Sequence, residues 1–376
     1  MTYLYGMEYS NKDFTQKGSF GKNTFTNAFP LSVAQYISLE KGLEIPVIRA
    51  IIGADGLPRT EHVKTPWASI INTDPANARF SVESSFTGYQ QYSHGVPNKS
   101  DVVIIDNLTG DHRRPLEIKL VVVPTSGSAN KPRNQQTCEI VSRPSTVEQV
   151  VFSIANDFGP SRRYELQEIL RNSLGVPNDY KWQDQTFMLG ALPRIVKSVD
   201  AIIEAGIGIQ TPLVLVAVWR SEGQVPVIEE DHAFDVFVWT ELAFLQLYLD
   251  SVRAQYIEAD GTLKAGHPAT ISRSARTLIW IVRALWDYTT QLTLNFTQVQ
   301  RDTSYGVQTD KAAAFAGAKT SRHMMSPEFL FPRVAGSEID YIFNPAGHDF
   351  LLPERRLDAA LSLRFTLDKL RKTETN

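Results

Sequence analysis

Apolar residues are distributed along this chain in two patterns, one typical of helices and one typical of buried strands. The helical spacing follows Pro30 within residues 20–45 and returns at 145–157, 161–174, 185–207, 272–294 and 354–372. Continuous apolar runs of strand length lie at 45–53, 101–106, 116–123, 211–220 and 235–239. Helices and strands therefore alternate, which predicts an α/β fold with a central mixed β-sheet flanked by helices.

Two stretches fit neither pattern clearly. Residues 60–99 are ambiguous, although the pair Asp74-Pro75 favours the start of a helix. From about 295 to 333, polar and basic residues interrupt the apolar spacing. No change in composition marks a linker, so we expect one domain over residues 1–376. Its catalytic core would occupy about 30–222 and a C-terminal elaboration about 223–376.

The predicted helix at 145–157 carries its own start signal. Ser145 stands three residues before Glu148, which is the spacing of a capping box. In such a box each side chain bonds a backbone N–H at the other end of the first turn. We therefore expect Ser145 and Glu148 to cap this helix.

Three charged residues stand within the apolar stretch SDVVIIDNLTGDHRRPLEIKLVVVP, residues 100–124. Asp101 begins the first apolar run, and Glu117 and Lys119 lie near the start of the second. Charged side chains are rarely buried unless they are paired or bind a metal. Residues two apart on a strand share a face, so Glu117 and Lys119 point the same way while their apolar neighbours point into a core.

The register of this hairpin decides which aspartate lies beside Glu117. Pairing residues 101–106 with 116–121 would bring Asp106 toward Glu117, and only a strong bend or crossing of the strands would bring Asp101 there. Simple hairpin geometry therefore favours Asp106. The turn sequence DNLTGD instead suggests that Asp106 ends a strand and starts a turn. Both aspartates stay candidates on these grounds.

The chemistry of this set suits a magnesium ion. Two carboxylates and the backbone carbonyl of Ile118 offer the oxygen ligands that Mg²⁺ prefers, and the ion would keep waters for substrate and nucleophile. Such an ion polarises a phosphodiester and lowers the pKa of a bound water. Lys119 would position that water, stabilise the transition state and reduce repulsion between the carboxylates when metal is absent.

This arrangement resembles the PD-(D/E)XK nuclease superfamily, which includes most type II restriction endonucleases. The signature of that superfamily is an acid at a strand start followed by Asp/Glu-x-Lys in the next strand. Here those residues are Asp101, Glu117 and Lys119, with Ser100 in place of the usual proline. The resemblance implies a restriction-endonuclease-like core, catalysis by these three residues, and Mg²⁺ bound by Asp101, Glu117 and the carbonyl of Ile118.

A broader resemblance is to restriction enzymes of the HindVP type. It is carried by TPLVLVAVWRSEGQVP at 211–226 and FDVFVWTELAF at 234–244. It implies cleavage of double-stranded DNA at a short palindrome, with a degenerate GC-rich hexamer such as GRCGYC as a candidate. A palindrome with two strands to cut implies a homodimer, and residues of about 225–350 would supply dimerisation and base recognition.

Composition narrows these expectations. The net charge of −3 and the pI near 6.2 do not indicate general affinity for nucleic acid, so any basic surface is local. The single cysteine, Cys138, excludes an internal disulfide and a cysteine-based zinc site and fits a reducing compartment. The start MTYLYGMEYSNKDF lacks the pattern of a signal peptide, and no apolar run is long enough to span a membrane. We therefore expect a cytoplasmic protein without membrane contact.

Contact with DNA requires Lys and Arg for phosphates, and Arg, Asn and Gln for bases. The favoured candidates lie near the predicted strands: Arg113, Arg114, Lys131, Arg133, Asn134, Gln135 and Gln136. A further stretch supplies Arg301, Lys311, Lys319 and Arg322.

Other residues are weaker candidates. Glu83 would be a further metal ligand if it lay on a helix before the strands. His94 and His112 flank the strands and are phosphate-binding candidates, although a surface histidine is the more ordinary role. No G-x-x-x-x-G-K-[ST] stretch is present, so no nucleotide cofactor is expected.

Two rival functions stay open. One is a repair or recombination nuclease with the same core and structural rather than sequence specificity. The other is a non-catalytic DNA-binding protein in which Glu117 and Lys119 are an ordinary surface pair.

Overall fold

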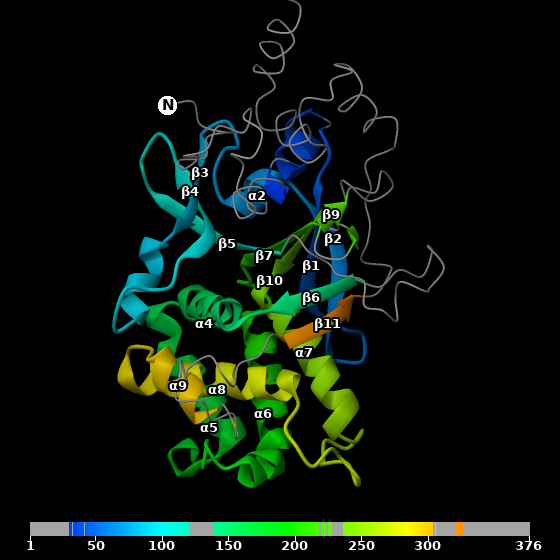
Figure 1. Ribbon diagram of the computed structural model, residues 1–376. Helices are drawn as coiled ribbons and strands as arrows, with labels where there is room; N and C mark the ends of the chain where they lie inside the picture. Colours follow the sequence, from blue (N-terminus) through cyan, green and yellow to red (C-terminus); the bar gives the residue numbers. More distant parts are fainter. Residues whose placement is uncertain are drawn as a thin grey trace, which may run out of the picture.

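A seven-stranded mixed sheet forms the centre of the protein (Figure 1). The computed structural model describes residues 30–31, 33–40, 42–119, 138–217, 220–222, 225–227, 236–303, 305 and 321–325. The strand order is β2-β1-β10-β7-β5-β4-β3. The strands are β1 (Ile45–Ile52), β2 (Pro58–Thr65), β3 (Ala78–Ser84), β4 (Ser100–Asp106), β5 (His112–Lys119), β7 (Pro212–Ala217) and β10 (Val236–Thr240). Only the pairs β1–β10 and β5–β7 are parallel in this sheet.

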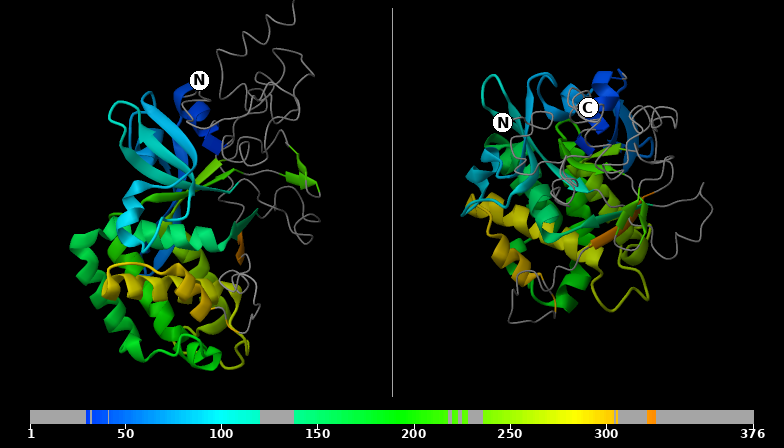
Figure 2. Two further views of the ribbon diagram at one scale, coloured as in Figure 1. Left: turned by 60° about the vertical axis from the view of Figure 1, so that its left-hand side comes forward. Right: turned by 45° about the horizontal axis from the view of Figure 1, so that its top comes forward.

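Most of the helices lie together on one side of this sheet (Figures 1 and 2). They are α4 (Pro144–Phe158), α5 (Arg163–Leu174), α6 (Gln185–Gly206), α7 (Glu241–Tyr256), α8 (Arg273–Gln291) and α9 (Phe296–Asp302). Two short turns connect helices of this group, η5 (Pro160–Arg162) and η6 (Pro177–Asp179). Three further short helical segments come earlier in the chain: η2 (Tyr36–Glu40), α2 (Trp67–Ile71) and η3 (Thr87–Tyr92). The predicted α/β fold, a mixed sheet with flanking helices, is confirmed.

The central strands β7 and β10 each correspond to a short, continuous apolar run in the sequence. Residues 213–216 and 236–239 are all at most 1% exposed, so both faces of each strand are buried. A strand buried on both faces shows a continuous apolar run instead of alternation. Strand β10 lies in the predicted C-terminal elaboration, yet it occupies a central place in the sheet.

Two small antiparallel pairs accompany the main sheet. Strand β6 (Cys138–Ser142) leads into α4 and pairs with the distant strand β11 (Ser321–Met325). Strands β8 (Arg220–Glu222) and β9 (Val225–Val227) form the other pair. In the part of the chain that the structure describes, no helix is long and apolar enough to cross a membrane.

Three predictions about local structure are wrong. No helix follows Asp74-Pro75, because the Asp74 carboxylate accepts the Ala76 N–H at 2.9 Å in a turn that leads into β3. The second hairpin strand starts at His112 rather than at residue 116. The predicted capping box is absent, since α4 starts at Pro144 and Glu148 is buried in its interior.

Some predicted elements cannot be compared with the structure. Residues 120–123 of the predicted hairpin strand lie outside the described residues, as does the predicted helix at 354–372.

Two buried carboxyl groups join the start of β7 to α4 and α7. The Thr211 N–H lies 2.8 Å and 2.7 Å from the two carboxyl oxygens of Glu241, and the Thr211 hydroxyl donates to Asp157. Burial raises the pKa of Glu241 well above its ordinary value, and the charge of Asp157 raises it further. Burial also raises the pKa of Asp157. Both shifts favour the protonated form of the pair.

We predict that this pair makes the protein less stable in alkaline solution. A carboxyl group with a raised folded-state pKa contributes its full stability below the unfolded pKa of about 4.3, and loses it as the pH rises through the folded pKa. Glu241→Gln keeps a hydrogen-bonding group without needing the proton. Relative to wild type, the variant should gain free energy of unfolding as the pH is raised from the acidic to the alkaline side of neutrality.

Urea unfolding on the acidic and on the alkaline side of neutrality measures this gain. The matched control is Glu204→Gln, which alters an exposed carboxylate on α6 and should show no comparable change. An equal pH dependence for the two variants would contradict the shared proton.

Candidate active site

The register of the β4–β5 hairpin brings Asp101 beside Glu117. Val102 pairs with Leu116, so the preceding residue, Asp101, lies across from Glu117. The expectation from simple hairpin geometry, that Asp106 would lie there, is wrong because β5 starts earlier than its apolar run. A short turn at 107–111 joins the strands, and pairing then runs back from it to the start of β4.

Asp106 has a structural place at the hairpin turn. Its carboxylate accepts the Leu108 N–H at 2.9 Å, the Thr73 hydroxyl at 3.1 Å and the Arg113 guanidinium at 2.8 Å. The bond from Arg113 is the main reason that the pKa of Asp106 lies below its ordinary value. This side chain holds the turn closed, far along the strand from Glu117.

Oxygen atoms from two strands converge on the ammonium group of Lys119. Its Nζ contacts Glu117 Oε1, lies 3.8 Å from Asp101 Oδ2 and lies 3.4 Å from the Ile118 carbonyl oxygen. The Ile118 N–H donates to Asp101 Oδ2 at 2.8 Å, which fixes that carboxylate against β5. The three predicted catalytic residues therefore form one cluster.

The electrostatics of this cluster favour a cation. Burial is the largest cause that raises the pKa of Asp101 to about 6, and the nearby Glu117 charge adds to it, while Lys119 acts in the opposite direction. The ammonium already occupies a position where two carboxylates and a carbonyl meet, so the donor set fits a hard cation. Among the described residues no group of three or more His, Cys, Asp or Glu side chains forms a metal site. The fit thus depends on two carboxylates and a backbone oxygen.

Glu83 lies next to this cluster, but on a strand. In the β3–β4 pairing, Val82 lies opposite Val102 and Ser84 opposite Ser100, which leaves Glu83 across from Asp101. Its backbone φ is 52°, a left-handed conformation unusual for a residue with a side chain. Its charge contributes to the raised pKa of Asp101. The expected position on a helix is wrong, and a role as metal ligand stays a prediction.

The first turn of α4 contributes a residue that the sequence did not indicate. Thr146 is fully buried, and its hydroxyl donates to Glu117 Oε1 at 3.1 Å. The Thr146 hydroxyl oxygen accepts the Arg143 N–H at 3.3 Å, so the hydroxyl proton is directed toward Glu117. A Thr at a helix start is the usual signal of a cap, and nothing in its spacing reveals the distant carboxylate.

The same helix also reaches the start of β4. The Ser100 hydroxyl donates to Gln149 Oε1 at 3.0 Å, and both side chains are buried. Ser100 stands where the superfamily signature has a proline. The hydrogen bond from its hydroxyl to Gln149 joins α4 to the strand that carries Asp101. Helix α4 therefore contacts both strands of the β4–β5 hairpin.

Two of the DNA-binding candidates, Arg113 and Arg114, bond to the protein itself. Arg113 pairs with Asp106, and Arg114 donates to the carbonyl oxygens of Ser69 and Ile70 at 3.1 Å and 2.7 Å. Their proposed contacts with DNA are untested. Lys131, Arg133, Asn134, Gln135, Gln136, Lys311 and Lys319 lie outside the described residues.

The two histidines lie apart from the carboxylate cluster. His94 Nε2 is 2.7 Å from the Thr293 hydroxyl, while His112 Nδ1 accepts the Thr87 N–H at 3.4 Å.

Comparison with known proteins finds relatives over nearly the whole chain. A family model described as HindVP restriction endonuclease matches residues 20–367. The chain is 30% identical over 360 residues to the type II restriction enzyme HgiDI of Herpetosiphon aurantiacus, covering 95% of this chain and 94% of that enzyme. It is 26% identical over 362 residues to the probable type II restriction enzyme HindVP of Haemophilus influenzae, covering 96% and 92%. No solved structure matches the chain.

The similarity therefore extends far beyond the short acid–acid–lysine motif. It includes the central strands β7 and β10 and continues through the C-terminal part of the chain. With that coverage, the protein belongs to the HindVP restriction endonuclease family, a family of type II restriction enzymes.

Proposed function

We propose that this protein is a Mg²⁺-dependent endonuclease that cuts double-stranded DNA at a short palindromic site, with Asp101, Glu117 and Lys119 as its catalytic residues. The observation that carries the proposal is the convergence of two carboxylates, the Ile118 carbonyl and a lysine at one hairpin. Restriction endonucleases typically use a divalent metal, and the oxygen donors here suit Mg²⁺.

Each residue has a distinct task in this proposal. Asp101, Glu117 and the Ile118 carbonyl would hold the metal, which polarises the phosphodiester and supplies a more acidic water. Lys119 balances the carboxylates in the metal-free protein. Once the carboxylates hold a metal cation, the Lys119 ammonium becomes available to hold the attacking water or to stabilise charge on the phosphate.

The expected palindrome implies a homodimer, because two active sites related by a two-fold axis cut two strands symmetrically. The degenerate hexamer GRCGYC is our candidate site. Digesting a genome of known sequence and sequencing the fragment ends would reveal both site and stagger, and light scattering would give the mass in solution. Fragments with unrelated ends, or branch-directed cutting, would favour a repair nuclease instead.

We predict opposite effects for the two aspartates of the hairpin. Asp101→Asn should lower the cleavage rate by about 100-fold or more, since it removes a metal ligand and the charge that holds the cation. Asp106→Asn should lower the melting temperature and leave cleavage at permissive temperature within a few fold. Timed plasmid digestion and thermal melting measure the two effects.

Lys119→Ala and Glu117→Ala should match Asp101→Asn in lost activity. Full activity in Asp101→Asn, together with loss in a folded Asp106→Asn protein, would reverse the assignment of the metal-binding aspartate.

We also predict that Thr146 positions Glu117. Thr146→Val keeps the shape of the side chain but removes the hydroxyl bonded to Glu117 Oε1. The Mg²⁺ concentration for half-maximal cleavage should rise, while Thr146→Ser should restore it because the hydroxyl returns. Titrating Mg²⁺ into the DNA-free protein by calorimetry should show the same order of affinities. Equal affinity in the Val variant and wild type would contradict this role.

A further inference from the structure

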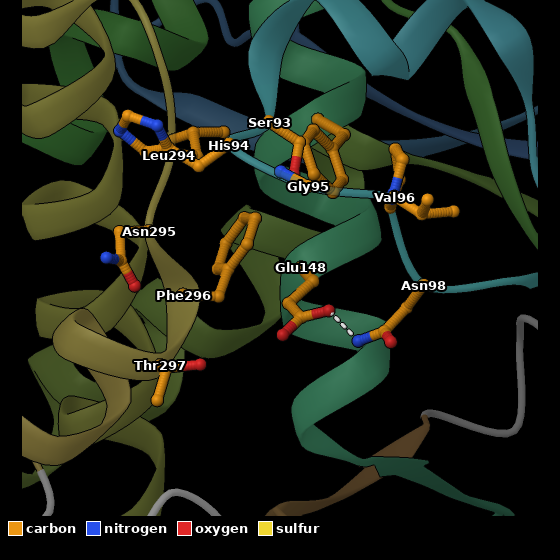
Figure 3. A pocket seen from close by; sticks show the side chains of 12 residues that line it. Ser93, His94, Gly95, Val96, Asn98, Glu148, Leu294, Asn295, Phe296 and Thr297 are labelled. Carbon is orange, nitrogen blue, oxygen red and sulfur yellow. Dashed lines mark hydrogen bonds between the residues drawn. The ribbon is translucent and has the colours of Figure 1, made fainter.

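A pocket of about 310 Å³ lies beside the catalytic hairpin (Figure 3). Its walls are residues 93–98, residues 294–297, and the side chains of Glu148 and Phe152 from α4. We call it the Glu148 pocket. Its volume is at the small end of the range of about 300–1,000 Å³ that is usual for ligand sites. None of its side chains belongs to the catalytic cluster.

Two chain connections place the pocket next to the catalytic cluster. Asn98 precedes Asp101 by three residues, a separation of at most about 11 Å even in a fully extended chain. Glu148 lies in the first turns of α4, as does Thr146, which bonds Glu117, although side chains two residues apart on a helix point to different sides. The pocket and the cluster therefore both lie near the start of β4 and the start of α4.

The pocket presents a hydrogen-bonding edge on one side. Asn98 on its loop donates to Glu148 Oε2, and Figure 3 shows the second carboxyl oxygen turned away from Asn98. Glu148 is 4% exposed, and this burial raises its pKa to about 7 against the opposing effect of the bond from Asn98. Near neutral pH the carboxyl group can thus act as a donor or as an acceptor.

An aromatic ring faces this edge. Figure 3 shows Phe296 across from Glu148, and Phe296 packs edge-on against Phe152 with ring centroids 5.0 Å apart. Phe152 is itself stacked on Tyr89, at 4.9 Å between centroids. The ring is therefore backed by a fixed aromatic row, which suits contact with a flat ligand.

The lining also excludes other ligands. Among the described residues that form the pocket, Glu148 is the only acid and no lysine or arginine is present. A single carboxylate is a poor site for a divalent metal, and a pocket whose one basic side chain is His94, which bonds the Thr293 hydroxyl, is a weak site for a phosphate. A neutral ring that carries both donors and acceptors fits the remaining chemistry, and a nucleobase is such a ring.

We propose that the Glu148 pocket receives a nucleobase unstacked from the substrate DNA near the proposed active site. The inference rests on the proposed function, since it needs double-stranded DNA in the active site. Asn98 and Glu148 would bond the Watson–Crick edge of the base, and Phe296 would contact its face. Enzymes that extrude a base offset the free-energy cost of unstacking with contacts of this kind.

Fluorescence of 2-aminopurine tests the proposal. A duplex carrying the site identified from the fragment ends receives this base at each position in and beside the site in turn. Binding is followed in Ca²⁺ in place of Mg²⁺ to prevent cutting. The wild-type protein should raise the emission severalfold at one position, because unstacking relieves quenching. Glu148→Ala and Asn98→Ala should lose most of that rise.

Affinity for a mismatched duplex gives a second measurement. A mismatch opposite the extruded base should tighten wild-type binding by about ten-fold, because part of the unpairing cost is already met. For the Glu148→Ala variant, the mismatch should tighten binding to a smaller extent. The control is Glu168→Ala, which removes an exposed carboxylate on α5 and should behave like wild type. If Glu148→Ala does not fold, Asn98→Ala gives the same comparison from an exposed loop.

The outcomes separate the pocket from the proposed function. Site-specific cutting by wild type, with no emission change at any position and no gain from a mismatch, would overturn the pocket alone. An emission rise or a gain from a mismatch that persists in both Glu148→Ala and Asn98→Ala would also overturn the proposal for the pocket. Wild-type protein that neither binds nor cuts DNA would overturn the proposed function and, with it, this inference.

Discussion

The pairing of Val102 with Leu116 is the constraint on which the cluster of Asp101, Glu117 and Lys119 depends. It places two carboxylates opposite each other on neighbouring strands, in surroundings that bury most of both side chains. Like charges in such a place repel strongly, and the arrangement persists because Lys119 lies between them. A shift of the register by one residue would turn Asp101 to the other face of the sheet.

The rest of the fold holds this register in place. Strand β5 is bonded on one side to β4 and on the other to β7, where Glu117 pairs with Val214. Because β7 is buried on both faces, the end of β5 that carries Glu117 pairs with a fully buried strand of the sheet. Helix α4 adds bonds to both hairpin strands through Thr146 and Gln149. Sheet and helix thus fix the cluster from two directions.

Strand periodicity was enough to predict that Glu117 and Lys119 share a face, and helical spacing located α5, α6 and α8 closely. It did not locate β2, an edge strand whose sequence PRTEHVKT is mostly polar because one edge faces solvent. The same problem affected β5, whose polar residues 112–114 hid its true start and so the register. Family resemblance gave Asp101 where local geometry favoured Asp106.

The roles of Thr146 and Glu148 depend on tertiary contacts, which no local spacing records. Ser145 and Glu148 matched a capping pattern, yet the helix begins one residue earlier and Glu148 points into a pocket. The polar loop at 131–136, our favoured DNA contact, lies outside the described residues. Its assignment therefore stays a prediction.

The ion pair between Lys119 and Glu117 has a consequence for folding. In many metalloproteins the ligands repel one another until metal binds, so the ion is needed to complete the fold. Here the chain supplies its own counter-ion from a residue two positions away. This ion pair offsets the repulsion between the carboxylates without a metal, so the free energy of binding a metal there would remain available for positioning DNA. A metal bound at this site would have to displace the Lys119 ammonium, and that displacement would lower its apparent affinity.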